Sequence, residues 1–337
     1  MTMVAPPLPT ELQVEVTGAC NLACEMCLVR YRPKLGRREG AMSFATFKSI
    51  VDELPALEKI TLQGLGEPLL APDLFEMIEY AAARGVRMGF NTNGTFLSRE
   101  RVERLVNAGL DWLHVSLDGA TAETYESIRH GSSFERVRKN VIGLVETMRE
   151  LHATRPVVQL VFVAMRRNVA EIPALVRLAQ EWGVGRLWVQ NLSHSFDDTM
   201  DSAGYGEIRL YAEREALWGG DDRAVAEDAF ARAQSTADEL GVELRLPRLE
   251  EPPAVARDPG APGCHWPFES AYVKYDAKVQ PCCMVMGSDR AILGDAEAKS
   301  FADVWHSPEY ASFRQGLTGS GEPPEVCRGC ALYRRVF

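Results

Sequence analysis

Apolar residues recur along residues 11–195 in two alternating patterns. Short stretches with apolar residues at every second position, or in nearly continuous runs, are typical of strands, and longer stretches with apolar residues three or four positions apart are typical of helices. The expected strands are residues 12–16, 59–63, 87–93, 112–118, 157–165 and 186–192. The expected helices are residues 43–54, 71–85, 98–109, a segment carrying Phe134 to Met148, and 172–183.

Six strand–helix units with apolar strands predict a parallel sheet covered by helices. The repeat takes about 180 residues, fewer than the roughly 250 of a closed eight-fold barrel, so the pattern predicts a partial (β/α)6 TIM-like barrel. In such barrels the functional side chains gather at the carboxyl ends of the strands. The polar stretches "LQGLGEP", "FNTNG" and "HVSLDG" fall at these ends.

The pattern changes after residue 195. A helix is expected over residues 221–241 and a strand over 242–246, and the stretch 247–263 carries five prolines. Such a composition is typical of a linker. Beyond it lies a compact segment with five of the eight cysteines, so we expect a second, smaller unit at the C-terminal end.

The composition narrows the classes of function. The chain is 46% hydrophobic and 25% charged, its net charge is -10, and it has no basic block, which argues against nucleic-acid binding. No secretory signal and no apolar run long enough for a membrane span are present. We therefore expect a cytoplasmic protein without a membrane partner. In that reducing compartment cysteines serve as metal ligands or reactive thiols more often than as disulfides.

Three cysteines follow the first expected strand in the stretch "GACNLACEMC", with the spacing C-x3-C-x2-C. Three thiolates on one loop can hold three corners of an iron–sulfur cubane and leave one iron open, whereas structural zinc sites and closed clusters use four. The alternative is a zinc site completed by a distant residue, in a protein that is a non-catalytic scaffold. The C-terminal cysteines could likewise hold zinc or a closed cluster.

This loop and the strand-end motifs resemble those of the radical S-adenosylmethionine (SAM) enzymes, over nearly the whole chain. The resemblance implies a [4Fe-4S] cluster on Cys20, Cys24 and Cys27 whose open iron binds SAM. One electron, from a donor such as flavodoxin or ferredoxin, would cleave SAM to a 5′-deoxyadenosyl radical that abstracts a substrate hydrogen. The implied domains are a partial barrel over 1–195, a connecting region over 196–262, and an auxiliary-cluster domain of the SPASM or Twitch type over 263–337.

The resemblance also implies a set of SAM-binding residues. The "GLGEP" motif resembles the glycine-glycine-glutamate motif that receives the SAM amino group, and Arg129 resembles the arginine that pairs with the SAM carboxylate. The cofactor-binding candidates are Gly64, Gly66, Glu67, Asn93, Ser116, Arg129, Gln190 and Asn191. Two alternatives stay open: Arg129 as a solvated surface residue, and Gln190 and Asn191 as partners of backbone groups.

The resemblance further implies a second, auxiliary [4Fe-4S] cluster. We expect its ligands to be Cys264, Cys282, Cys327 and Cys330. Adjacent residues of a strand point in opposite directions, so Cys283 is left over. Its role is either that of a small buried hydrophobe or that of a catalytic hydrogen-atom donor to a substrate radical, as an epimerase would need.

The expected substrate is a small polar natural-product intermediate of the sugar, aminocyclitol or nucleoside type, dehydrogenated or epimerised by an oxidoreductase. The alternative is a ribosomal precursor peptide that is cross-linked or epimerised. With the first strand near residue 12, an N-terminal peptide-clamp domain does not fit, which favours the small molecule. His194 is a candidate general base. Other candidates that face the substrate are Glu15, Gln159, Arg166 and Asp197.

Overall fold

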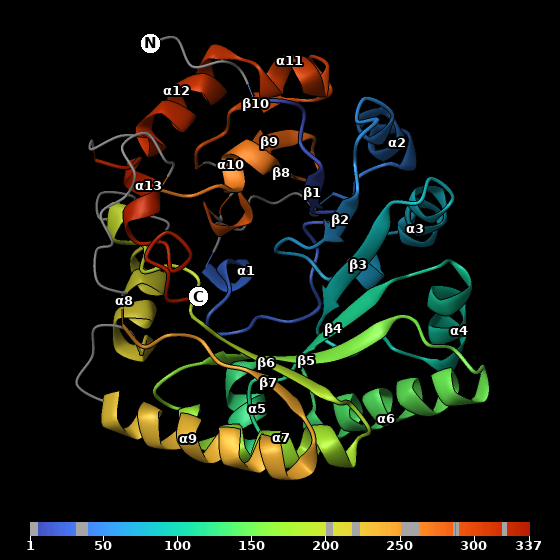
Figure 1. Ribbon diagram of the computed structural model, residues 1–337, viewed down its shortest axis with the longest axis vertical. Helices are drawn as coiled ribbons and strands as arrows, with labels where there is room; N and C mark the ends of the chain where they lie inside the picture. Colours follow the sequence, from blue (N-terminus) through green and yellow to red (C-terminus); the bar gives the residue numbers. More distant parts are fainter. Residues whose placement is uncertain are drawn as a thin grey trace.

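The computed structural model describes residues 6–31, 40–199, 205–217, 223–250, 263–285, 287, 290–318 and 322–337. One ten-stranded sheet runs through this part of the chain in the order β10-β9-β8-β1-β2-β3-β4-β5-β6-β7. The sheet curls, and helices cover its outer side (Figure 1). The architecture is therefore the partial barrel that the sequence pattern predicts.

The six expected strands form the parallel centre of the sheet. They are β1 (Glu11–Val14), β2 (Lys59–Leu62), β3 (Arg87–Thr92), β4 (Trp112–Ser116), β5 (Val157–Ala164) and β6 (Arg186–Asn191). Val14 lies opposite Leu62, and Leu62 lies opposite Phe90, so the carboxyl ends of neighbouring strands stay together. The loops that carry the polar motifs are thereby gathered at one end of the barrel.

The expected helices connect these strands. They are α2 (Phe44–Asp52), α3 (Leu74–Ala82), α4 (Arg99–Asn107), α6 (Phe134–Glu150) and α7 (Ile172–Glu181). Ser43 and Ser98 each accept a hydrogen bond from a first-turn amide and begin their helices, as N-cap residues do. Gly85 ends the turn after α3 with a φ of 74°, a conformation that costs glycine no strain.

The two faces of the barrel strands differ in polarity. Ile60, Leu62, Leu113 and Val115 are fully buried and belong to the hydrophobic core between sheet and helices. Residues that alternate with the apolar ones along the strands line the inside of the barrel: Gln13, Glu15, Lys59, Thr61, Asn91, Trp112, His114, Trp188 and Gln190. Burial of the apolar face stabilises the barrel, and the polar face is left to line its lumen.

The region after β6 adds a seventh parallel strand. Helix α9 (Arg223–Leu240) leads into β7 (Glu243–Arg245), which pairs with β6. Both elements match the expected helix and strand. Most of the expected linker at 247–263, namely residues 251–262, lies outside the described residues. The short helices α1 (Leu28–Tyr31), α5 (Ala122–Ile128) and α8 (Gly206–Glu215), and the 3-10 turns η1 (Pro68–Leu70), η2 (Val169–Glu171), η3 (Asp197–Thr199) and η4 (Cys283–Val285), were not expected.

The C-terminal segment continues the barrel sheet. Its elements are α10 (Trp266–Glu269), β8 (Ser270–Val273), β9 (Lys278–Gln280), β10 (Gly294–Asp295), α11 (Phe301–Trp305), α12 (Pro308–Leu317) and α13 (Glu325–Arg328). Strand β8 lies parallel to β1, with Val273 opposite Val14. The segment therefore extends the sheet beyond the first strand of the barrel.

No helix in the described residues is long and apolar enough to cross a bilayer.

Candidate functional site

The loop with the three cysteines lies between β1 and α1 and is fixed by its backbone. Ala23 N–H donates to the His130 carbonyl at 3.0 Å, and Glu25 N–H donates to the Ile128 carbonyl at 2.9 Å. Burial raises the pKa of the Cys24 thiol to about 12, and charge on the Cys27 and Cys20 thiols adds to that shift. The three thiols are thus within electrostatic reach of one another, as the ligands of one cluster must be.

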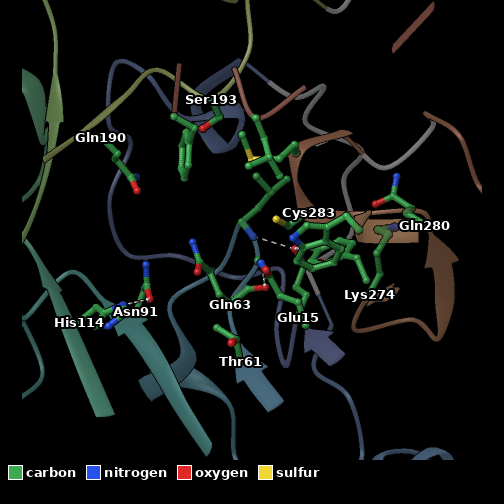
Figure 2. Close-up of a pocket in the computed structure, with 18 of the residues that line it drawn as sticks. Glu15, Thr61, Gln63, Asn91, His114, Gln190, Ser193, Lys274, Gln280 and Cys283 are labelled. Carbon is green, nitrogen blue, oxygen red and sulfur yellow. Dashed lines mark hydrogen bonds between the residues drawn. The ribbon is translucent and has the colours of Figure 1, made fainter. Parts of the chain in front are cut away.

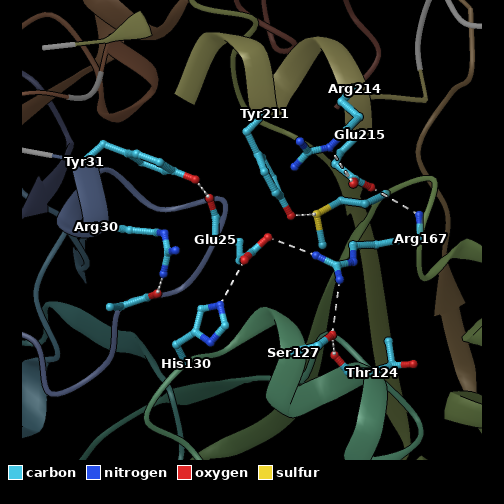
Figure 3. A network of polar contacts seen from close by, with 12 residues as sticks. Glu25, Arg30, Tyr31, Thr124, Ser127, His130, Arg167, Tyr211, Arg214 and Glu215 are labelled. Atoms are coloured by element: carbon cyan, nitrogen blue, oxygen red, sulfur yellow. Dashed lines mark hydrogen bonds and ion pairs between the residues drawn. The ribbon is translucent and has the colours of Figure 1, made fainter. Parts of the chain in front are cut away.

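A network of ionic contacts braces the same loop (Figure 3). The Glu25 carboxylate, between two of the cysteines, lies 2.9 Å from His130 Nε2 and 3.0 Å from Arg167 Nη1. Partial burial would raise the pKa of Glu25, but the His130 hydrogen bond and the Arg167 charge outweigh it and lower the pKa. The loop is therefore held from the ends of α5 and β5, a support that the sequence alone did not reveal.

The "GLGEP" motif lies directly against the cysteine loop. A Cβ on Gly66 would lie 2.0 Å from the Thr17 carbonyl oxygen, and a Cβ on Gly64 would lie 2.3 Å from Glu15 Cγ. The backbone N–H of Glu67 donates to the Ala19 carbonyl at 2.8 Å. Only glycine permits this close approach, which brings the end of β2 onto the cysteine loop.

The Glu67 side chain is buried at the junction of β2 and β3. Its carboxylate accepts hydrogen bonds from Thr92 Oγ1 at 2.7 Å, Asn93 N at 2.8 Å and Leu69 N at 3.3 Å. Burial raises its pKa, and these three donors oppose that shift. The Glu67 carboxylate thus joins the ends of β2 and β3, and its contact with a SAM amino group stays a prediction.

Asn93 connects β3 to the cysteine loop. Its Nδ2 donates to Asn21 Oδ1 at 2.9 Å and lies 4.0 Å from Cys20 Sγ, while its Oδ1 accepts from Thr95. The side chain therefore lies beside the first thiol, and its contact with SAM stays a prediction.

Arg129 forms a buried ion pair rather than a surface contact. Its guanidinium donates to Asp118 Oδ2 from Nε at 2.7 Å and from Nη2 at 2.6 Å, and the Asp118 side chain is fully buried. Asp118 Oδ1 also accepts from Val163 N at 2.8 Å. The interpretation of Arg129 as a solvated surface residue is therefore wrong. Its charge is close enough to Cys24 to lower the pKa of that thiol, which puts the guanidinium beside the cysteine loop.

Gln190 and Asn191 point to opposite faces of β6. Gln190 lines the barrel lumen, whereas the fully buried Asn191 donates from Nδ2 to the carbonyls of Val336 at 2.6 Å and Arg248 at 2.9 Å. Asn191 is therefore a partner of backbone groups, as one of the alternatives above has it. The two residues differ because successive strand residues alternate between faces. Ser116 follows His114 on the inward face of β4.

His194 is buried away from the lumen. Its Nδ1 accepts the N–H of Phe196 at 2.8 Å, and its Nε2 donates to the Val326 carbonyl at 2.7 Å. Asp198 lies 3.9 Å from Nδ1, but that nitrogen already serves as an acceptor, and burial lowers the pKa of the ring to about 4. The prediction of His194 as a general base is therefore corrected. Both ring nitrogens are hydrogen-bonded to backbone groups, and the ring joins the chain after β6 to α13.

A cavity of about 490 Å³ occupies the barrel lumen (Figure 2). Of the further candidates, Glu15 lines it, and Gln159, Arg166 and Asp197 do not. The Glu15 carboxylate accepts from Leu65 N at 2.7 Å and from Tyr272 Oη at 2.8 Å, and burial raises its pKa. Side chains of the C-terminal segment complete the wall: Trp266, Tyr272, Lys274, Gln280, Cys283, Met284, Leu332 and Phe337.

His114 is a lumen residue that sequence reasoning missed. Its Nδ1 lies 3.1 Å from Asn91 Oδ1, and its ring packs edge-on against Trp188 with centroids 6.1 Å apart. Burial, and secondarily the charge of Lys59, lowers its pKa to about 4, so the ring is neutral at pH 7. The alternation of "WLHVS" could have identified it, because Leu113 and Val115 occupy the apolar face and leave His114 on the other.

The five C-terminal cysteines come together from separate segments. Burial raises the pKa of Cys282, and charge on Cys283, Cys330, Cys327 and Cys264 adds to the shift. Cys283 also lines the lumen. No three His, Cys, Asp or Glu side chains in the described ranges converge tightly enough for a single metal ion. An iron–sulfur cubane is wider than one ion, and an all-cysteine donor set suits it. The residues present therefore fit a cluster at each cysteine set.

Comparison with known families gives two matches. The model described as "Radical SAM superfamily" matches residues 14–179, and the SPASM model, described as "Iron-sulfur cluster-binding domain", matches residues 264–331. These ranges contain both cysteine sets and the strand-end motifs described above.

Several curated relatives align over nearly the whole chain. The AdoMet-dependent heme synthase of Methanosarcina barkeri is 29% identical over 96% of this chain and 91% of its own length. The PqqA peptide cyclase of Gluconobacter oxydans is 26% identical over 99% of this chain and 86% of its own length. Among solved structures, Streptococcus suis SuiB bound to S-adenosylmethionine superposes with a TM-score of 0.70 at 18% identity, over 97% of this chain and 72% of that one. This likeness confirms the fold.

Proposed function

This chain belongs to the radical SAM superfamily and carries a C-terminal SPASM iron–sulfur domain, and from that premise we propose that it modifies a peptide by cross-linking or epimerisation. The observation that carries the proposal is the alignment with the PqqA peptide cyclase over 99% of this chain. The same alignment favours a peptide over the small molecule expected above, since a relative named as a peptide cyclase aligns with almost every residue here.

The lumen supports a substrate that inserts a short part of itself. A volume of about 490 Å³ is within the range of roughly 300–1,000 Å³ that small-ligand pockets occupy. Trp266, Leu332 and Phe337 of the C-terminal segment and Gln190 of the barrel line one continuous space. A peptide that reached this space would present one or two side chains to the reacting end of the barrel.

The cofactor-binding residues follow from the site. Cys20, Cys24 and Cys27 would hold the cluster that binds SAM, and the C-terminal cysteines would hold the auxiliary cluster. When bound, SAM and its cluster supply a radical that takes a hydrogen atom from the substrate. The protein's own contribution is to orient the substrate in the lumen and to exclude water from it. Glu15 and Tyr272, joined by a hydrogen bond, form part of the lumen wall.

A small-molecule substrate is the second candidate. It is favoured by the alignment with the AdoMet-dependent heme synthase, which covers 91% of that relative. Dehydrogenation or epimerisation of a sugar, aminocyclitol or nucleoside intermediate belongs to this candidate.

Deuterium transfer to 5′-deoxyadenosine separates the two candidates. The reconstituted holoenzyme is incubated anaerobically with SAM and dithionite, with either a randomised decapeptide library of perdeuterated amino acids or a mixture of perdeuterated sugars and nucleosides. We expect deuterated 5′-deoxyadenosine with the peptides, and none from a Cys24→Ala variant. Deuterium from the sugars and nucleosides alone would overturn the peptide proposal.

A further inference from the structure

Two tryptophans that line the lumen each have a cation beside the ring. Trp112 lies over β3, where a Cβ on Gly89 would come within 2.2 Å of the indole, so glycine makes room for the ring. Lys59 Nζ is 5.9 Å from the Trp112 ring centroid, and Arg245 Cζ is 4.3 Å from that of Trp188. All four side chains line the cavity.

These two cations are only partly neutralised. Lys59 forms one ion pair with Glu11 at 3.0 Å, and the Glu11 side chain is 47% exposed, so water screens the pair. Arg245, at the end of β7, has no carboxylate partner within the described residues. A guanidinium that lines a cavity without a partner is free to bind an anionic oxygen pair with two parallel hydrogen bonds.

The same wall holds an unused neutral donor. Trp188 Nε1–H is buried and has no acceptor in the part of the chain that the structure describes. A buried donor without an acceptor costs free energy, and because this nitrogen is closed to solvent, a ligand in the lumen does not reach it. Trp188 therefore acts in the lumen through the ring face on which the Arg245 guanidinium lies.

The lumen offers little competition for these donors. Among the described residues that line the cavity, Glu15 is the one with a carboxylate side chain, and that group already accepts hydrogen bonds from Leu65 N and Tyr272 Oη. His114 is neutral at pH 7 because burial lowers its pKa to about 4. The cavity lining, with Lys59, Lys274 and Arg245 against Glu15, thus has excess positive charge in a chain whose net charge is -10.

We propose that Arg245, stacked on Trp188, forms a carboxylate-binding subsite for the substrate in the lumen, and that Lys59 adds positive charge to the same cavity. This inference rests on the proposed function, because a peptide supplies carboxylates, as acidic side chains or as its C-terminus, and no phosphate. Arg245 and Lys59 are positioning and specificity residues here, and the reacting carbon lies elsewhere on the substrate.

Calorimetric binding to the anaerobic holoenzyme with SAM tests this subsite without turnover. Three nearly isosteric probes are compared: N-acetylglutamic acid α-amide, with a side-chain carboxylate; N-acetylglutamine, with a C-terminal carboxylate; and N-acetylglutamine amide, with neither. We expect at least one carboxylate to bind about tenfold more tightly than the neutral probe, as one charge-assisted hydrogen bond gives. The tighter of the two identifies the source of the carboxylate. Equal binding of all three would overturn the subsite, as would tighter binding of N-acetylphosphoserine amide.

Two variants locate the effect. Arg245→Gln is expected to weaken the preferred carboxylate probe about tenfold. The matched control is Arg186→Gln on the same strand pair, where Arg186 pairs with Glu243 outside the cavity. We expect no change there. An equal loss in Arg245→Gln and Arg186→Gln would mean general electrostatic attraction and overturn the assignment. Deuterium transfer from peptides can succeed or fail independently of this result, so the two proposals are tested separately.

Discussion

The carboxylate of Asp118 divides its two oxygens between the Arg129 guanidinium and the N–H of Val163. Because both charges are buried, removing one leaves the other without compensation. We therefore expect Asp118→Asn to lower the free energy of unfolding by about 3–5 kcal/mol, measured by anaerobic urea denaturation. The control is Asp228→Asn, which breaks the exposed pair with Arg232 on α9 and should cost less than about 1 kcal/mol. Equal effects would show that the buried pair is not a structural support.

The buried His194 side chain makes the free energy of unfolding depend on pH. Its pKa is lowered from 6.5 to about 4 in the folded protein. Between these values the unfolded chain protonates the ring and the folded chain does not, so the free energy of unfolding falls as the pH is lowered. We expect His194→Gln to remove a dependence on the order of 3 kcal/mol from the wild-type curve between pH 6.5 and 4. Parallel curves for the two proteins would contradict this.

At the scale of elements, the contact between the β2 loop and the cysteine loop depends on Gly66. A methyl group there would overlap the Thr17 carbonyl oxygen, which is backbone and cannot rotate away. We expect Gly66→Ala to displace the cysteine loop, so that the reconstituted protein loses SAM binding by at least tenfold in equilibrium dialysis.

Gly143→Ala on α6 is the matched control, since a Cβ there meets nothing within 4 Å. It should bind SAM normally and gain up to about 1 kcal/mol of stability, because alanine is the better helix former. If Gly66→Ala also bound SAM normally, the close approach would have no part in cofactor binding.

At the scale of the whole molecule, the two cysteine sets predict two clusters and about eight iron atoms per chain. Cys283→Ala should keep both, because Cys264, Cys282, Cys327 and Cys330 provide four ligands, whereas Cys282→Ala should leave about four iron atoms. Iron and sulfide analysis with Mössbauer spectroscopy measures this. A loss of iron in Cys283→Ala would make that residue a ligand.

If Cys283→Ala keeps its iron, product analysis then tests the other role of this thiol, which lines the lumen. A hydrogen-atom donor is needed for epimerisation and not for cross-linking. Loss of the epimerised product, with 5′-deoxyadenosine still formed, would assign the donor; an unchanged product would leave Cys283 a wall residue.

The elements of the barrel were predictable because each signal is local. Apolar periodicity located the six strands and five helices, with Ser43 and Ser98 as caps. Helix α5, with only seven residues, is too short for a periodic signal. The continuation of the sheet through β8 was also missed, since Val14 and Val273 are far apart in sequence and no local pattern records their pairing.

The sequence by itself determined the chemistry: the spacing of Cys20, Cys24 and Cys27, the glycines of "GLGEP", and the alternating strands that form the barrel. Tertiary structure decided which side chains reach the lumen. Gln190 faces it and Asn191 does not, and His114 faces it while His194 is bound by backbone groups. Residue type is a local property, but the face on which a side chain lies depends on strand register, and its partners depend on segments distant in sequence.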